Sequence, residues 1–288
     1  MVVYIDDSNI YSEKWEDHLN YIDRVLSKCT PINLKISLKK CNFGQQELLA
    51  VGHKVSGISL AIDQNKVAAV LQNPVPKRIK EMRYFLGFAS YHRNHIKSFA
   101  HITSSLYKLC SKDVVFEFTK EKRDLYERIK HELTNAPVLI LPDFELPFKL
   151  KIKAACSQGL GVALHQRQIV DGVPREGVIC YISRKLKDSE ARYGATRWAL
   201  EKLHCYLESA VFEVYTDFKA MKSLLNMKTT HRHILRWQIA IQVYTGNMII
   251  IYKEGKIHTN ADGHWIMSKA TQLIILKLQP KSLSISWK

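Results

Sequence analysis

The chain has 288 residues, a net charge of +16 and a composition that is 46% hydrophobic and 10% aromatic. This apolar content excludes a disordered chain, and the length is typical of about two domains. No apolar run approaches the roughly 20 residues that span a bilayer, so we expect no membrane partner. The positive charge indicates a polyanionic partner such as nucleic acid, because Lys and Arg displace counterions from phosphates; the alternative is that it only aids solubility.

Cysteine usage and the start of the sequence bear on the compartment. The six cysteines show no C-x-x-C spacing, and the first residues carry no basic flank of a secretory signal. Both features predict an intracellular protein with reduced thiols, in the cytoplasm or the nucleus.

The first 73 residues alternate short apolar runs with turn-forming residues. Residues 2–5 are β-prone, Asp6-Asp7-Ser8 supply a turn and residues 10–11 return, which predicts a hairpin. Apolar residues at helical spacing predict a helix over residues 14–27, with Trp15 in a core position. Further strands are expected at residues 35–38, 48–51 and 55–62, before a helix over residues 63–72.

Pro74-Val75-Pro76 marks a boundary, because proline fits neither a helix interior nor a central strand. Two helical blocks follow at residues 80–110 and 120–135, and residues 136–147 indicate a connector. The second half alternates strands and helices, with Asp171-Gly172 as a tight turn between two strands. Its strands are expected at residues 148–152, 160–166, 178–183, 211–216 and 248–252, and its helices at 191–207, 220–226 and 232–244.

Two groups of polar residues are candidates for chemistry or binding. Asp6 and Asp7 place adjacent carboxylates on the hairpin tip, where a divalent cation such as Mg²⁺ or Mn²⁺ would offset their repulsion. Asp is also a common turn former, so a structural turn stays open as the alternative. Arg232, His233 and Arg236 fall on a predicted helix, where they either contact phosphate or form a solvated face.

Short motifs follow one another in order along residues 1–265. They are Tyr4-Ile5-Asp6-Asp7, LKKCNF at 38–43, GHKVSGI at 52–58, RYFLGFASYHR at 83–93, PVL at 137–139, PD at 142–143, YISR at 181–184, EARY at 190–193, Thr216-Asp217, Arg236-Trp237 and NADG at 260–263. In this order they resemble the reverse transcriptase and ribonuclease H region of long-terminal-repeat retrotransposons and retroviruses, most closely the gypsy class.

The resemblance implies an α/β (α+β) fold with several parts. They are a truncated reverse-transcriptase palm (1–73), a thumb-like helical segment (74–118), a connector (119–147), an RNase-H-like mixed-sheet domain (148–265) and an unassigned tail (266–288). It also implies RNA-directed DNA synthesis and cleavage of RNA in RNA–DNA hybrids, both with Mg²⁺ or Mn²⁺. By resemblance, Asp6, Asp7, Asp217 and Asp262 are the catalytic metal ligands.

The sequence departs from the family pattern at other catalytic carboxylates. The third polymerase Asp would lie before residue 1, and the first ribonuclease H Asp is replaced by Lys153 or Ala154. The family Glu is lost with a deletion of about two helical turns, and Glu190 or Glu201 could substitute for it. We therefore expect a nucleic-acid-binding protein with impaired catalysis. The alternatives are an active enzyme that uses substitute ligands or a partner chain, and a domesticated interaction protein without chemistry.

Overall fold

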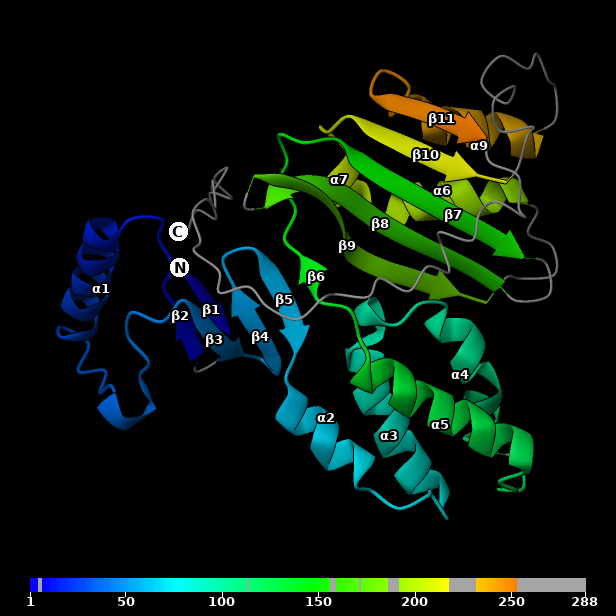
Figure 1. Cartoon of the computed structure of the whole chain (residues 1–288), viewed down its shortest axis with the longest axis horizontal. Coiled ribbons are helices and arrows are strands. Elements are labelled where there is room, and N and C mark those ends of the chain that lie inside the picture. The colour runs from blue at the N-terminus through cyan, green and yellow to red at the C-terminus, as the bar shows by residue number, and fades with distance from the viewer. Residues whose placement is uncertain are drawn as a thin grey trace. The chain divides into compact units, whose positions relative to one another are not determined.

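The structure, a computed structural model, describes residues 1–4, 7–112, 114–155, 159–170, 172–185, 192–217 and 232–252 (Figure 1). The described residues divide into two compact units, one within Met1–Asp63 and the other from Gln64 onwards. Helices and sheets are mixed in them, as the sequence predicts. Within the described ranges, no helix has the length and apolar character that crossing a membrane requires.

The first unit begins with the predicted hairpin, in a tighter form. Strands β1 (Val2–Tyr4) and β2 (Asp7–Asn9) are antiparallel, with Tyr4 opposite Asp7. Asp7 and Ser8 therefore lie in the second strand and not in the turn, because a shorter turn lets more residues join the ladder.

Helix α1 (Trp15–Cys29) confirms the helix predicted over residues 14–27. The core position expected for Trp15 is wrong: this side chain is 61% exposed. Its ring lies against Gly44, where an added Cβ would stand 3.1 Å away. The strand expected at residues 35–38 is also wrong. Local hydrogen bonds from Lys40 N to Ser37 O and from Cys41 N to Leu38 O form the 3₁₀ helix η1 (Leu38–Lys40) in this region.

Three antiparallel strands complete the first unit, namely β3 (Glu47–Ala50), β4 (His53–Ser56) and β5 (Ser59–Ile62). The alternating segment at residues 55–62 was expected as one strand, but it turns back on itself. Ser56 Oγ accepts a hydrogen bond from Ser59 N at 3.1 Å, and this side-chain bond closes the turn.

The second unit opens with a helical segment. Its elements are α2 (Gln64–Leu71), α3 (Ile79–Tyr91), η2 (Arg93–His95), α4 (Phe99–Lys108) and α5 (Lys120–Thr134). The helical block expected at residues 80–110 is interrupted after Tyr91, and Ser98 has a left-handed backbone conformation. Phe85 of α3 packs on Tyr126 of α5, with ring centroids 4.4 Å apart. Helix α2 contacts α5 and so belongs to this unit.

The strands of the second half are β6 (Leu139–Ile140), β7 (Phe148–Ala155), β8 (Gly159–Val170), β9 (Val173–Arg184), β10 (Phe212–Thr216) and β11 (Met248–Tyr252). Five of them form a mixed sheet in the order β11-β10-β7-β8-β9, in which β7 runs parallel to β10 and antiparallel to β8. Gly172, with φ +76°, stands between β8 and β9, as predicted.

Helices α6 (Arg192–Lys202), α7 (His204–Leu207) and α9 (Arg232–Gln242) cover one face of this sheet (Figure 1). The core between them contains Phe148, Leu150 and Ile152 of β7 and Phe212 of β10. Alternate residues of β7 therefore point away from the helices. The helix expected at residues 220–226 and the tail at 266–288 lie outside the described residues, and the proposed domain boundaries stay predictions.

Candidate functional site

Asp217 and Lys153 are neighbours at one edge of the mixed sheet. Strands β7 and β10 are parallel, with Thr216 opposite Ile152, and Asp217 directly follows β10. The register continued by one residue places Lys153 beside Asp217. Lys153 and Ala154 stay alternatives for the position of the lost Asp, and the strand register brings Lys153 next to Asp217.

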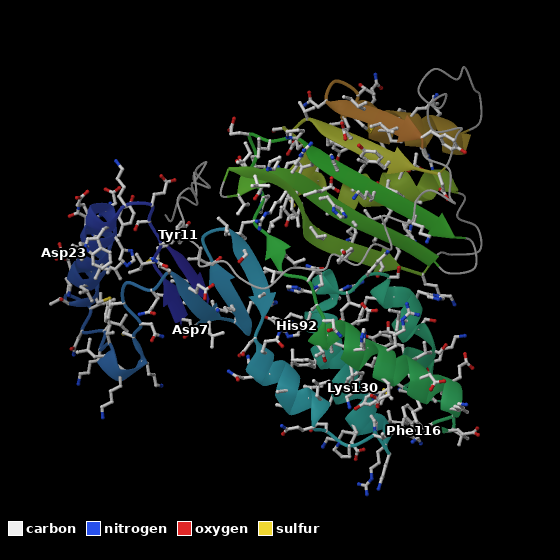
Figure 2. All side chains as sticks on the ribbon, in the orientation of Figure 1. Asp7, Tyr11, Asp23, His92, Phe116 and Lys130 are labelled. Atoms are coloured by element: carbon white, nitrogen blue, oxygen red, sulfur yellow. The ribbon has the colours of Figure 1, made fainter. Side chains whose placement is uncertain are left out.

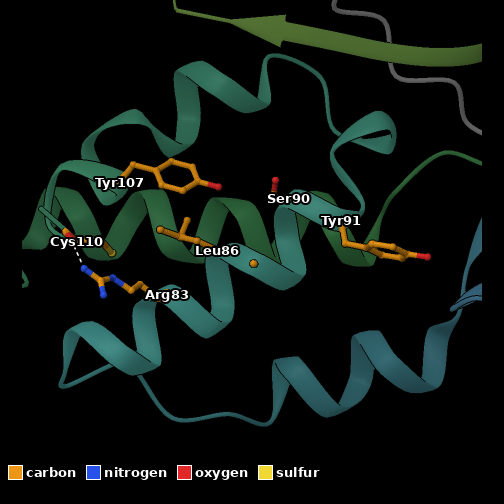
Figure 3. A pocket seen from close by; sticks show the side chains of 7 residues that line it. Arg83, Leu86, Ser90, Tyr91, Tyr107 and Cys110 are labelled. Carbon is orange, nitrogen blue, oxygen red and sulfur yellow. Dashed lines mark hydrogen bonds between the residues drawn. The ribbon is translucent and has the colours of Figure 1, made fainter.

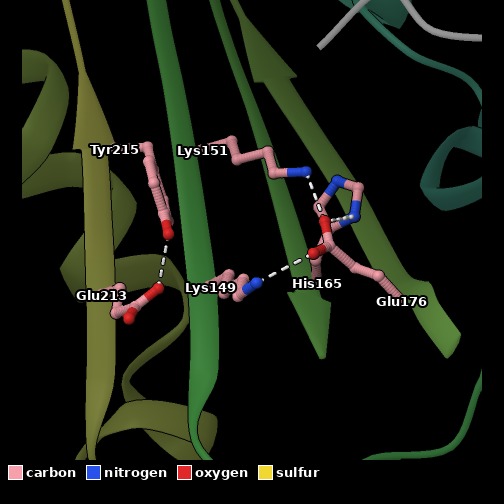
Figure 4. A network of polar contacts seen from close by, with 6 residues as sticks. All are labelled: Lys149, Lys151, His165, Glu176, Glu213 and Tyr215. Atoms are coloured by element: carbon pink, nitrogen blue, oxygen red, sulfur yellow. Dashed lines mark hydrogen bonds and ion pairs between the residues drawn. The ribbon is translucent and has the colours of Figure 1, made fainter. Parts of the chain in front are cut away.

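An ionic network occupies the same sheet face, away from the helices (Figure 4). A carboxylate oxygen of Glu176 lies 2.9 Å from Lys149 Nζ, and the other lies 2.6 Å from Lys151 Nζ. Burial alone would raise the pKa of Glu176, but hydrogen bonds and charge from Lys151 and Lys149 lower it to about 2. The carboxylate of Glu176 is thus engaged by two ammonium groups.

Glu213 of β10 also lies on this face, opposite Lys149 in the strand register. Tyr215 Oη donates a hydrogen bond to Glu213 Oε2 at 2.5 Å (Figure 4). Burial, followed by the hydrogen bond to Glu213, raises the pKa of Tyr215 to about 12, so the phenol stays a donor at neutral pH. Glu213 therefore already accepts a hydrogen bond within the sheet.

The described residues do not form a metal centre. None of their His, Cys, Asp and Glu side chains form a group of three or more that could hold a metal ion. Glu201, expected as a possible substitute ligand, accepts a hydrogen bond from Arg197 Nε at 2.6 Å on an exposed helix face. Asp262 and Glu190 lie outside the described residues. Asp217 with Lys153 supplies one carboxylate and one ammonium, and this donor set does not fit a pair of divalent cations.

The other predicted site residues belong to other elements of the chain or lie outside the described residues. Asp7 lies on the exposed hairpin of the first unit, and Asp6 is outside the described residues (Figure 2). Arg236 is exposed on α9, where it is accessible to solvent. The side chains of Arg232 and His233 are outside the description, so the role of this basic helix face stays a prediction.

A groove of about 550 Å³ runs between α3 and α4 (Figure 3). Arg83, Gly87 and Tyr91 line it from α3, and Tyr107 lines it from α4. Arg83 Nη2 donates to the carbonyl of Cys110 at 2.7 Å, which fixes the guanidinium at one end. A Cβ on Gly87 would meet no atom within 4 Å, so the backbone of α3 is open to close approach there.

This groove was not identified from the sequence, although a signal was present. Arg83, Gly87 and Tyr91 are spaced four residues apart, which places all three on one face of a helix. In the sequence, these three residues stood out only as part of the motif at residues 83–93. An exposed glycine between a cation and an aromatic residue at this spacing indicates a binding face, since none of the three fills a core.

Comparison with known proteins agrees with the fold. Residues 143–244 match the family "RNase H-like domain found in reverse transcriptase". Two foamy viral protease-reverse transcriptase structures have TM-scores of 0.69. The one in complex with RNA/DNA hybrid is 19% identical and covers 98% of this chain and 38% of its own. The one in complex with dsDNA is 20% identical and covers 88% and 54%. At these identities the likeness shows the fold.

The chain also has sequence relatives among transposon polyproteins. The retrovirus-related Pol polyproteins from the Drosophila melanogaster transposons gypsy and 297 are 33% identical over 280 residues and 32% identical over 269. The Schizosaccharomyces pombe transposon Tf2-3 polyprotein is 29% identical over 273 residues. These matches cover 90–91% of this chain but span only 20–26% of the relatives' length. These sequence matches, with the match to the RNase H-like family, support a retroelement Pol fragment, in which a stretch similar to reverse transcriptase continues into an RNase H-like domain.

Proposed function

We propose that the chain binds double-stranded nucleic acid, in particular RNA–DNA hybrid, and is impaired in metal-dependent cleavage of that hybrid. The observation that carries this proposal is the register of β7 and β10, which sets Lys153 beside Asp217. Hydrolysis by two divalent cations needs several carboxylates around the metals. An ammonium group at this position repels the cations, and it can contact a phosphate directly.

The groove between α3 and α4 supports duplex binding from a second surface. Gly87 leaves the helix backbone open, Tyr91 and Tyr107 offer exposed aromatic rings, and the net charge of +16 favours a polyanion. Aromatic and cationic groups around an open backbone suit a sugar–phosphate chain, because they combine stacking, hydrogen bonding and charge. The matched foamy viral structures are complexes with dsDNA and with RNA/DNA hybrid, which agrees with this assignment.

The proposal is tested with the purified chain, an end-labelled RNA–DNA hybrid, and either Mg²⁺, Mn²⁺ or EDTA. We expect binding that persists in EDTA, weakens steeply with salt, and produces no cleavage on a denaturing gel. Lys153→Ala should weaken binding and reduce the salt slope by about one. Lys153→Asp should weaken binding in EDTA more than Lys153→Ala does, because it adds a negative charge beside Asp217.

Cleavage by the wild-type chain would contradict the proposal if Asp217→Asn and Asp262→Asn both abolish it. That result would favour the active enzyme and prompt a search for its remaining ligands. Failure to bind any duplex, by a sample shown to be folded, would favour the protein-interaction alternative. Salt-insensitive binding to a protein partner would distinguish that alternative further.

A further inference from the structure

Helix α4 begins without a cap from its own sequence. The preceding residue, Ser98, has φ +52° and ψ +30°, and its side chain makes no capping hydrogen bond. The first amide groups of a helix have no acceptor within the helix, and a capping oxygen on the preceding residue usually satisfies one of them. The start of α4 therefore needs an acceptor from elsewhere in the fold.

That acceptor comes from the RNase H-like sheet. Ser183 of β9 accepts a hydrogen bond at its Oγ from the backbone amide of Ala100, the second residue of α4, at 2.9 Å. Its carbonyl accepts a second bond, from Arg93 Nη2, at 2.8 Å. Ser183 is only 3% exposed, so both bonds are shielded from water. A residue 83 positions later in the chain thus caps α4.

The backbone around Ser183 is shaped for this contact. Gly161 of β8 is the strand partner of Ser183. A Cβ on Gly161 would stand 3.3 Å from Ser98 Oγ, which is tighter than ordinary contact. The missing side chain lets the strand pair approach the start of α4 closely. We refer to Ser183, Arg93 and the amide of Ala100 as the Ser183 joint.

We propose that the Ser183 joint holds the helical segment and the RNase H-like sheet as one body, so that one duplex contacts the α3–α4 groove and the Asp217 edge together. This inference rests on the proposed duplex binding. Two surfaces held at a fixed spacing bind a long ligand more tightly than two loosely linked ones, because the second contact forms at a high effective concentration. Ser183 and Arg93 are then positioning residues for the duplex.

The joint itself is tested on the full chain by amide hydrogen exchange. Ser183→Ala removes the capping oxygen, and Thr103→Val is the matched control, since Thr103 Oγ donates to Phe99 O within α4 and its removal leaves the joint intact. We expect faster exchange at the amide of Ala100 for Ser183→Ala. The sheet core and η2 should be unchanged, because the carbonyl of residue 183 still accepts from Arg93. Thr103→Val should leave exchange at the amide of Ala100 unchanged. Unchanged exchange in Ser183→Ala would overturn the joint.

The functional consequence is tested with RNA–DNA hybrids of increasing length in EDTA. For the wild type and Thr103→Val, affinity should rise in a step at the length that spans both surfaces. For Ser183→Ala the step should shrink by about tenfold or more, while affinity for short hybrids is unchanged. A full step in Ser183→Ala overturns the one-body inference. A wild-type chain that binds no hybrid overturns the proposed function, and the exchange result then reports separately on the joint.

Discussion

His165 Nδ1 lies 3.5 Å from a carboxylate oxygen of Glu176, yet the imidazole of His165 is not protonated at neutral pH. Burial is the main cause, since the ring is only 7% exposed. The positive charge of Lys151 adds to it, and together these outweigh the attraction of Glu176 and lower the pKa of His165 to about 4. Lys149 and Lys151 thus bind the carboxylate of Glu176, which would otherwise favour the protonated form of His165.

This arrangement predicts acid sensitivity. The pKa of His165 is about 4 in the folded chain and 6.5 in an ordinary environment, so between these values the unfolded chain binds a proton that the folded chain does not. The free energy of unfolding should therefore fall by on the order of 3 kcal/mol as the pH drops through this window. Glu176, with its pKa lowered from 4.5 to about 2, adds a further loss between those two values. Chemical denaturation at a series of pH values measures both.

The matched variant for this prediction is His165→Gln, which keeps a buried polar side chain but cannot titrate. Its free energy of unfolding should show a flatter dependence on pH between 6.5 and 4 than the wild type. An identical slope in the two proteins would assign the acid sensitivity to other groups.

Glu176→Gln should destabilise the chain by about 2 kcal/mol, because it leaves the half-buried ammonium groups of Lys149 and Lys151 without their counter-charge. Glu47→Gln is the control, since Glu47 pairs with Lys54 on an exposed hairpin and such pairs contribute little. Equal losses in the two variants, measured by urea denaturation, would mean that burial does not distinguish the pairs.

Gly87→Ala should move stability and binding in opposite directions. Alanine in the middle of α3 stabilises the helix by about 0.5–1 kcal/mol, and its Cβ meets no atom within 4 Å. The same methyl group obstructs the groove, so affinity for a duplex should fall. Gly246→Ala, also without neighbours within 4 Å, serves as the control and should not change affinity. Undiminished duplex binding by Gly87→Ala would remove the groove from the proposed interface.

Gly177→Ala should destabilise the sheet by about 1–3 kcal/mol through overpacking. A Cβ on Gly177 would stand 2.6 Å from Cγ2 of Ile140, so β6 and β9 approach closely only because this residue has no side chain. Repeating Gly177→Ala in an Ile140→Ala background tests the cause, since alanine lacks the Cγ and Cδ atoms that the added methyl group would meet. A loss of stability as large in that background as in the wild type would place the strain elsewhere.

Much of the fold follows from residue patterns. The alternation of Phe148, Leu150 and Ile152 with three lysines predicts a strand with one buried face, and the Asp-Gly turn predicts the hairpin of β8 and β9. The incorrect predictions fall where local hydrogen bonds or neighbouring elements determine the structure. The alternating pattern of residues 55–62 does not reveal that Ser56 closes a turn inside it. The apolar spacing around Trp15 predicts a buried face, whereas α1 buries no residue among the described ones.

Only part of the candidate site could be predicted from the sequence. The motifs predict Asp217 as a site residue and leave Lys153 or Ala154 at the position of the lost Asp, whereas the place of Lys153 next to Asp217 follows only from the strand register. The joint at Ser183 could not be predicted, because it depends on two motifs 90 residues apart meeting through a backbone carbonyl. A motif match assigns residue types to positions, whereas a contact between elements depends on how they pack.

The capping of α4 by Ser183 also has a consequence for the order of folding. When Ala100 is added to the growing chain, the residue that completes the start of this helix is still 83 positions from synthesis. The first turn of α4 should therefore stay frayed until β9 joins the sheet. This long-range dependence couples the rate at which the helical segment matures to the slower assembly of a mixed sheet. The nascent helical segment therefore stays incompletely folded, as the substrates of chaperones are, until β9 has been made.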